Sequence, residues 1–333
     1  MPTLQWVGKD KVVNHHLDVP FRVLNKVSSF RAPEGTPANS TDNRIIHGDN
    51  LEALKSLLPE FEGKVKCIYI DPPYNTGNEG WVYNDAVNDP KIKRWLGKVV
   101  GKEGEDLSRH DKWLCMMYPR VKLLHRLLAK DGVIFASIDD NEAVHLQQLL
   151  NEIFGAESFL AKLVWKRKAG GGDDSEHVAT EHEYVLCYAK RKQFAKISRV
   201  LHESPAMTAK YNKVENGRRY YLERLDKTSL TYSESMDFPI ECPDGSFVSP
   251  PHPDPKNPTT SWRWSEKAVK ERREELQFIK EKKTNEWRIY TRTWEPSEGV
   301  TPRSLLVDKD FGRNRDGTQE LDSILGPKVF NNP

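Results

Sequence analysis

The sequence has few cysteines, no long apolar run and little net charge, and each shortage excludes a class of protein. Its four cysteines, Cys67, Cys115, Cys187 and Cys242, are widely spaced and form no Cys-x-x-Cys pair, which excludes a disulfide framework and a zinc knuckle. No run of about 18 apolar residues is present to span a membrane, and no signal peptide precedes the first polar residues. We therefore expect a cytoplasmic protein without a membrane partner, long enough for two domains.

The formal net charge of +2 says nothing by itself about nucleic acid. The distribution of charge is more informative, because residues 190–227 contain eleven lysines and arginines against four acidic residues. This stretch is a candidate surface for a polyanion.

One short stretch carries the strongest chemical signal. Val65–Ile70 is rich in β-branched and aromatic residues, which predicts a buried strand. Asp71-Pro72-Pro73 ends it, because proline lacks the ladder donor and disfavours helical backbone in the residue before it. An acid, a rigid extended backbone and the Tyr74 ring are thus presented at the carboxyl edge of a strand, where open α/β sheets bind ligands.

These groups suit chemistry on the exocyclic amine of a base, which is a poor nucleophile because its lone pair is delocalised into the ring. The Asp71 carboxylate and the Pro72 carbonyl can each accept one N–H hydrogen bond and so favour a pyramidal, nucleophilic nitrogen. The Tyr74 ring can stack on the base, an interaction of about 1–3 kcal/mol. A base in a duplex would have to be flipped out to reach such a pocket. The alternative is an ordinary strand-ending turn, since Asp-Pro is a common turn signal.

Asp71-Pro72-Pro73-Tyr74 resembles the catalytic motif of amino-methyltransferases that act on DNA adenine. Its continuation through Asn75-Thr76-Gly77 resembles the modification subunits of type III restriction–modification systems. The resemblance implies site-specific adenine-N6 methylation with S-adenosyl-L-methionine, with Asp71, Pro72, Pro73 and Tyr74 as catalytic residues. It also implies double-stranded DNA as substrate, a restriction subunit as a possible partner and a homodimer when the enzyme is complete.

The segment before this strand predicts a strand, a tight turn and a helix. Arg44–Asp49 is expected as the strand, and Asp49-Asn50-Leu51-Glu52 as the capped start of a helix with an apolar leucine face. Asp49 would then lie at the same edge of the sheet as Asp71. The resemblance places Asp49 and Asp71 near the adenosine of the cofactor, whereas a plain helix cap is the alternative for Asp49.

Helices and strands alternate after the motif, which predicts an α/β fold with a parallel or mixed sheet. By resemblance this is a Rossmann-like methyltransferase sheet. Residues 1–43 are expected as short strands or as an N-terminal arm packed on the body, and residues 44–192 as the catalytic region. The polar stretch 78–109, with Trp81, Tyr83 and Trp95, predicts a functional lid or a disordered loop. The expected elements are a helix at His110–Lys130, a strand at Val133–Ile138 after an Asp131-Gly132 turn, a helix ending at Phe154, and strands at Phe159–Trp165 and Tyr184–Tyr188.

Residues 193–325 predict an inserted α+β domain, placed where the family carries its target-recognition domain. Aromatic residues alternate with bases, as in Arg218-Arg219-Tyr220-Tyr221, which suits phosphate contact and base reading. A charged helix is expected at residues 266–283 and a strand at Glu286–Tyr290. The candidate DNA-binding residues are Lys166, Arg167, Lys168, Arg218 and Arg219. His177, His182 and Glu183, taken as scattered polar loop residues, predict no metal site.

The family builds its cofactor pocket with a Phe-x-Gly-x-Gly strand and turn, and this sequence contains none. Residues 326–333 resemble the beginning of the segment that leads to it, and Phe330 is a further candidate for cofactor contact. We therefore expect a sheet that is incomplete at the C-terminus, with a companion polypeptide supplying the motif. A truncated enzyme, a split enzyme and a catalytically incomplete module that binds DNA or a partner are the alternatives. The recognition sequence is not readable from these residues.

Overall fold

The computed structural model describes residues 3–29, 43–76, 90–101, 108–168, 177–200, 209–227, 231–254, 256–282, 284–308 and 311–327. The chain divides into two compact units, one of Met1–Ile197 with Arg303–Pro333 and one of Ser198–Pro302. The inserted unit thus ends well before residue 325, because the chain after residue 302 returns to the sheet of the first unit. Phe330, and Trp81 and Tyr83 of the expected lid, lie outside the described residues. Trp95, also expected in the lid, lies in helix α4 (Pro90–Val99) and packs against the main core, so this part of the expected loop is a helix.

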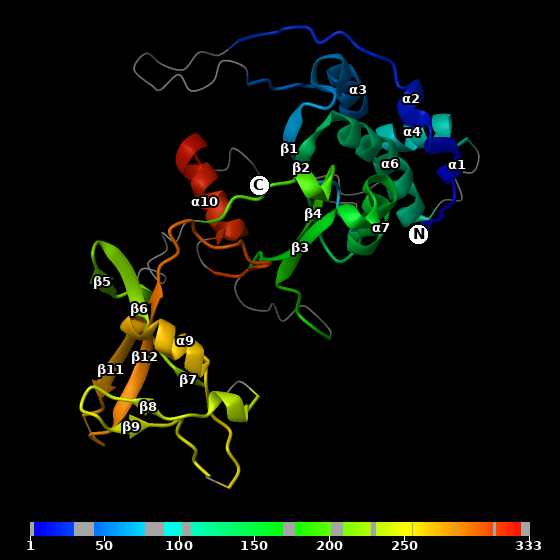
Figure 1. Cartoon of the computed structure of the whole chain (residues 1–333). Coiled ribbons are helices and arrows are strands. Elements are labelled where there is room, and N and C mark those ends of the chain that lie inside the picture. The colour runs from blue at the N-terminus through cyan, green and yellow to red at the C-terminus, as the bar shows by residue number, and fades with distance from the viewer. Residues whose placement is uncertain are drawn as a thin grey trace. The chain divides into compact units, whose positions relative to one another are not determined.

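The first unit is built on a mixed sheet whose described strands follow the order β1-β2-β4-β3-β13 (Figure 1). β1 is parallel to β2 and β13 is parallel to β3, whereas β4 is antiparallel to both β2 and β3. The α/β fold class predicted from the sequence is confirmed. The strands are β1 (Val65–Ile70), β2 (Leu128–Ile138), β3 (Phe159–Lys166), β4 (His182–Ala189) and β13 (Leu305–Leu306).

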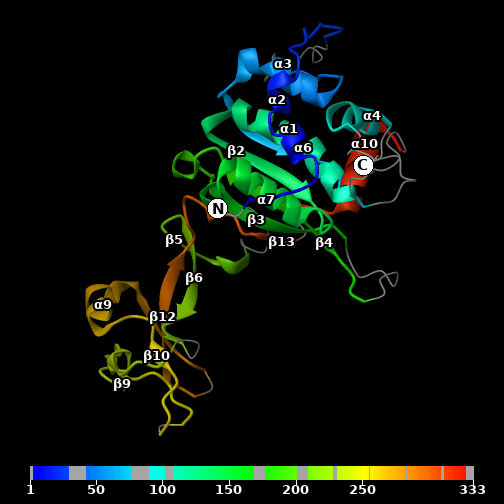
Figure 2. The ribbon, with the colours of Figure 1, turned by 90° about the vertical axis from the view of Figure 1, so that its right-hand side faces the viewer.

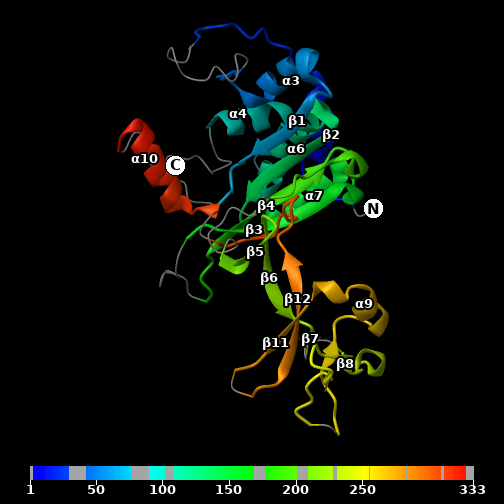
Figure 3. The same cartoon turned by 60° about the vertical axis from the view of Figure 1, so that its left-hand side comes forward.

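Helices pack against this sheet and enclose the main apolar core. Helix α6 lies at the centre, in contact with α1, α2, α3, α4 and α7 (Figures 2 and 3). Its start is well defined, because Ser108 and Asp111 form a capping box. The helices of this unit are α1 (Lys9–Val12), α2 (His15–Asp18), α3 (Asn50–Phe61), α4 (Pro90–Val99), α6 (Arg109–Leu127), α7 (Ala143–Phe154) and α10 (Asn314–Leu325), with 3₁₀ turns η1 (Ala156–Ser158) and η2 (Lys192–Phe194).

Strand β2 begins earlier than the sequence predicts and continues through the expected Asp131-Gly132 turn. A Cβ atom on Gly132 would lie 2.6 Å from the backbone oxygen of Val65. Glycine therefore lets β1 and β2 approach at this point, and a residue that suggested a turn instead serves close strand pairing.

Two expectations for the N-terminal part are wrong. The short strands expected in residues 1–43 are replaced, among the described residues, by helices α1 and α2. Arg44–Asp49 is not a strand either, and Ile45 is fully exposed. A strand requires a ladder partner, and no described strand pairs with β1 on the side opposite β2.

The second unit contains a four-stranded antiparallel sheet, in the order β11-β12-β6-β5, within its described residues. The helix expected over 266–283 stops after Glu271, and Leu276–Lys280 pairs with β12 instead. Leu276 and Phe278, two residues apart, pack on the core of this unit, so burial follows the strand period. The elements are β5 (Lys213–Glu215), β6 (Arg218–Arg224), β7 (Asp226–Lys227), η3 (Glu234–Met236), β8 (Ile240–Glu241), β9 (Phe247–Val248), β10 (Ser261–Trp262), α9 (Glu266–Glu271), η4 (Arg273–Glu275), β11 (Leu276–Lys280) and β12 (Trp287–Trp294).

None of the helices in the described part of the chain has the length and apolar character needed to cross a membrane.

Candidate functional site

The Asp71–Asn75 segment leaves the sheet at the carboxyl end of β1, directly after Ile70. Ile70 pairs with Ala136 of the parallel strand β2, so the segment lies at the edge where both strands end. Asp71 is exposed, Pro72 is buried and Tyr74 is half-buried. The strand and its end are therefore where the sequence placed them, at the ligand-binding edge of an α/β sheet. The expected burial of this strand is wrong: only Ile68 is buried, and Lys66, Cys67 and Tyr69 are exposed, because no described strand pairs with β1 on the side opposite β2.

The Tyr74 hydroxyl donates a hydrogen bond to Oε2 of Glu183, over 3.3 Å. Burial raises the pKa of the Tyr74 phenol, and the nearby Glu183 and Asp71 carboxylates raise it further. Tyr74 is consequently a neutral donor at physiological pH. Glu183, near the start of β4, is 8% exposed. Burial raises the pKa of Glu183, and Arg167, 3.1 Å away through its Nη1, opposes this effect.

The backbone of the motif is held from helix α6. The indole Nε1 of Trp113 donates to the carbonyl of Pro73 over 2.6 Å. Trp113 is completely buried, so this donor has a fixed position. The hydrogen bond fixes the peptide between Pro73 and Tyr74. This peptide directly follows the one that carries the Pro72 carbonyl, which is one of the two expected acceptors for a target amine.

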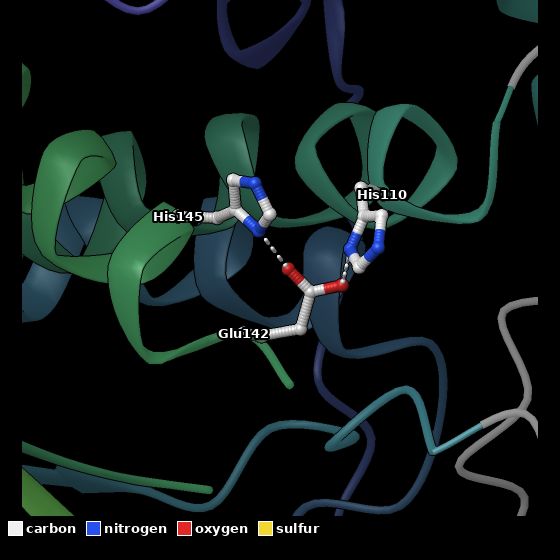
Figure 4. A group of neighbouring side chains, drawn as sticks. All are labelled: His110, Glu142 and His145. Atoms are coloured by element: carbon white, nitrogen blue, oxygen red, sulfur yellow. Dashed lines mark hydrogen bonds and ion pairs between the residues drawn. The ribbon is translucent and has the colours of Figure 1, made fainter. Parts of the chain in front are cut away.

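Asn75 connects the motif to a buried polar network. It is completely buried and has a positive φ of 60°, a backbone conformation that asparagine tolerates better than most residues. Its Nδ2 donates to Oε1 of Glu142, and also approaches the carbonyl of Arg109 at 3.4 Å. Figure 4 shows Glu142 between two histidines, with Nδ1 of His110 and Nδ1 of His145 each 2.8 Å from one of its oxygens.

Sequence reasoning missed this network. Asn75 stood in the extended motif and Glu142 followed the end of a predicted strand, so both carried a usable signal. Nothing in the sequence indicated that these two residues are in contact, because Asn75 and Glu142 are 67 positions apart.

The same cluster contains side chains of the types that bind metal ions. Within the described residues, His110, Glu142 and His145 form a group whose ligand atoms lie within 4.8 Å of one another. The two Nδ1 atoms approach different oxygens of Glu142 (Figure 4), which suits two hydrogen bonds better than three ligands converging on one ion. His182 and Glu183, taken as loop residues from the sequence, lie in β4. The expectation of a site without metal stays a prediction.

Asp49 caps helix α3. Its Oδ1 accepts from the backbone N–H groups of Leu51 and Glu52, over 2.9 and 3.1 Å. Asp49 also lies near Arg120. Burial lowers the pKa of the Arg120 guanidinium, and the negative charge of Asp49 opposes this effect. The helix cap is therefore present, and the cofactor contact stays a prediction.

The candidate DNA-binding residues differ in the contacts that their side chains already make within the protein. Lys166 pairs with Glu181 at 2.9 Å, and Arg167 pairs with Glu183 beside Tyr74. Arg219 pairs with Glu295 at 3.1 Å. Arg218 is exposed, with its guanidinium 4.9 Å from the centre of the Trp294 ring. Lys168, the fifth candidate, is half-buried, and its charge lies near Glu181. Of the five, Arg218 has the most accessible charge for a phosphate.

Comparison with known proteins shows a match of residues 65–304 to a family model described as DNA methylase (N6_N4_Mtase). The type III restriction-modification enzyme EcoPI Mod subunit of Escherichia phage P1 is 30% identical, over 99% of this chain and 55% of that protein. The type III StyLTI Mod subunit of Salmonella typhimurium is 41% identical, over 47% of this chain and 25% of that protein. The type II methyltransferase M.KpnI of Klebsiella pneumoniae is 29% identical, over 90% of this chain and 70% of that protein. The chain thus spans about half the length of the EcoPI subunit.

Solved structures give weaker likenesses. M1.HpyAVI in complex with SAM is 15% identical, with a TM-score of 0.29, over 48% of this chain and 60% of that chain. The PvuII DNA methyltransferase (cytosine-N4-specific) is 11% identical, with a TM-score of 0.28, over 48% of this chain and 59% of that chain. These scores carry no argument about the site.

Proposed function

Because the chain belongs to the DNA methylase family, we propose that it forms the target-base part of a DNA adenine-N6 methyltransferase that uses S-adenosyl-L-methionine. The observation that carries the proposal is the position of Asp71-Pro72-Pro73-Tyr74, at the carboxyl end of β1 and held by Trp113. The identities of the substrate, of the cofactor and of the partner protein belong to this proposal.

The chemistry assigned to the chain is activation of the amine. Asp71 and the Pro72 carbonyl each accept one N–H of the adenine N6 group, which directs the nitrogen lone pair away from the ring. The cofactor supplies an electrophilic methyl group when bound. Tyr74 stacks on the flipped-out base while its hydroxyl stays bonded to Glu183, so the ring has a fixed orientation before the base arrives.

The described residues fit the adenosine part of the cofactor in chemical type. Asp49 and Asp71 supply carboxylate oxygens, which accept hydrogen bonds from the hydroxyl and amine groups of a nucleoside. Asp49 uses one oxygen, Oδ1, for both bonds of the helix cap. We propose that these two side chains contact the adenosine.

The relatives with the longest coverage include Mod subunits of type III restriction-modification enzymes. We extend this similarity to the partners of the present chain, and propose double-stranded DNA as the substrate and a restriction subunit as the partner. The proposed phosphate contacts are Arg218 and Lys168. Further proposed contacts are Lys166, Arg167 and Arg219, each of which would first have to break its ion pair with an acidic side chain.

The proposal is tested by incubating the protein that carries this chain with DNA and methyl-labelled cofactor, and by identifying the modified base by mass spectrometry. We expect N6-methyladenine from the wild type, and a rate about 10²- to 10³-fold lower from Asp71→Ala with DNA binding retained. Asp131→Ala, which removes an exposed carboxylate paired with Lys66, is the matched control and should keep its activity.

Wild-type turnover by Asp71→Ala would contradict the assigned mechanism. Label on cytosine would contradict the substrate. Binding of DNA by the wild type without any transfer of label would favour a DNA-binding module instead.

A further inference from the structure

Glu142 is a completely buried carboxylate that the proposed chemistry does not use. It precedes helix α7 as the N-cap residue, and its side chain makes no cap hydrogen bond within that helix. Its Oε1 accepts from Asn75 and from Nδ1 of His110, while Oε2 accepts from Nδ1 of His145. Since a carboxylate has only acceptors, each histidine donates from Nδ1, and these donors compensate the cost of burying the charge.

The bond to Asn75 connects this network to the motif. Asn75 directly follows Tyr74, and its φ of 60° lies in the left-handed region, which asparagine adopts more readily than most residues but less readily than glycine. Such a conformation persists when surrounding contacts determine it, and the contacts here are those of the buried amide with Glu142 and the Arg109 carbonyl. The direction in which the chain leaves Tyr74 therefore depends on Glu142.

A second contact acts on the other side of Tyr74. Trp113 of α6 holds the carbonyl of Pro73, so the residues before and after Tyr74 are both fixed from helices behind the sheet edge. The histidines hold Glu142 in turn, and their side chains are 39% and 32% exposed for His110 and His145. Both histidines are thus partly exposed, and their hydrogen bonds orient the buried carboxylate.

We infer that Glu142, oriented by His110 and His145, is a positioning residue that fixes Asn75 and thereby holds Tyr74 and Asp71 in the geometry required for methyl transfer. The inference rests on the proposed function. Glu142 acts through Asn75, so its removal affects the rate of the chemical step more than the binding of DNA.

The first test is Glu142→Gln, which keeps the size of the side chain and replaces one acceptor oxygen by a donor. That donor cannot receive the N–H of a histidine or of Asn75. We expect the single-turnover methylation rate at saturating DNA and cofactor to fall by about 10²-fold, because a small misplacement of reacting groups has an effect of this size. The KM for DNA should stay close to that of the wild type, whereas the melting temperature should fall because a buried N–H group loses its acceptor.

The second test reaches the same contact from the other side. Asn75→Gly removes the amide but allows the positive φ, since glycine adopts this conformation freely. We expect the same loss of rate, and no further loss in the Glu142→Gln/Asn75→Gly double variant, because both changes remove one interaction. If Glu142→Gln fails to fold, Asn75→Gly alone carries the test.

The matched control is Glu152→Gln on the same helix, α7. Glu152 binds Nζ of Lys9 at 2.7 Å and the hydroxyl of Tyr118 at 3.2 Å, away from the motif. This variant should keep the wild-type rate even where its melting temperature falls.

An active wild type combined with wild-type rates in Glu142→Gln and Asn75→Gly would overturn the inference and leave the proposed function standing. Additive losses in the double variant would also overturn it. Stoichiometric zinc in the wild type, lost in Glu142→Gln, would replace the positioning role by a metal site. A wild type without methylation would overturn the proposed function, and the inference with it.

Discussion

At the scale of single residues, Tyr74 combines two properties that substitution can separate. Its ring is available for stacking, while its hydroxyl is bonded to Glu183. Tyr74→Ala should lower the single-turnover methylation rate by roughly 5- to 150-fold, corresponding to about 1–3 kcal/mol of lost stacking. Tyr74→Phe should lose less than about tenfold, because the ring is retained. Equal losses in both variants would show that the hydroxyl has a direct chemical role.

Trp113 offers a test of stability at the same scale. Trp113→Phe leaves the Pro73 carbonyl without its buried donor, so we expect the free energy of unfolding in urea to fall by about 1–3 kcal/mol. Trp6→Phe is the control, because the Trp6 indole donates to the sulfur of Cys115, a weak acceptor, and its loss should cost less. A larger effect at Trp6 would contradict the importance assigned to the motif backbone.

At the scale of elements, helix α6 and strand β4 are joined by a half-buried histidine near the end of the helix. Lys190, directly after β4, donates through Nζ to Nδ1 of His125 over 3.1 Å. Burial, and to a smaller extent the positive charge of Lys190, lower the pKa of His125 to about 4. His125 is therefore neutral in the folded protein near pH 7.

The lowered pKa predicts how stability depends on pH. Between about pH 6.5 and 4 the unfolded chain binds a proton at His125 that the folded protein does not, so the free energy of unfolding decreases as the pH falls. The slope from this residue is at most about 1.4 kcal/mol per pH unit. Urea unfolding at pH 7 and pH 5 should show a smaller difference for His125→Gln than for the wild type. An unchanged difference would contradict the assignment.

Local sequence determines some elements and contacts between distant segments determine others. Val65–Ile70 was predicted as a strand with its observed bounds, because its composition and the prolines after it act locally. Leu276–Lys280 was predicted as helix and is a strand, because pairing with β12 overrides the charged, helix-favouring composition. Arg44–Asp49 has the composition of a strand but lacks a partner among the described strands.

At the scale of the whole molecule, DNA binding should combine charges from separate segments and depend steeply on salt. Arg218→Ala should weaken binding to all duplex sequences and reduce the slope of log Kd against log salt by about one. Arg219→Ala should instead lower stability, because Glu295 loses its partner. Fluorescence anisotropy over a salt series measures the first effect, and thermal unfolding measures the second. Binding that ignores salt, or equal slopes for Arg218→Ala and the wild type, would contradict the assignment.

The sequence by itself determined the α/β class, the strand at Val65–Ile70, the Asp71-Pro72-Pro73-Tyr74 motif at its end and the cap at Asp49. These features depend on neighbouring residues, through proline geometry, β-branched side chains and a side chain that bonds the next turn of backbone.

The tertiary structure alone decided which groups surround the motif. Trp113 lies 40 positions from Pro73, and Glu142 lies 67 from Asn75. Arg167, a predicted DNA contact, is bonded to Glu183 because β3 and β4 are adjacent. Contacts of this kind arise from the order of strands and the packing of helices, which short-range sequence patterns do not encode.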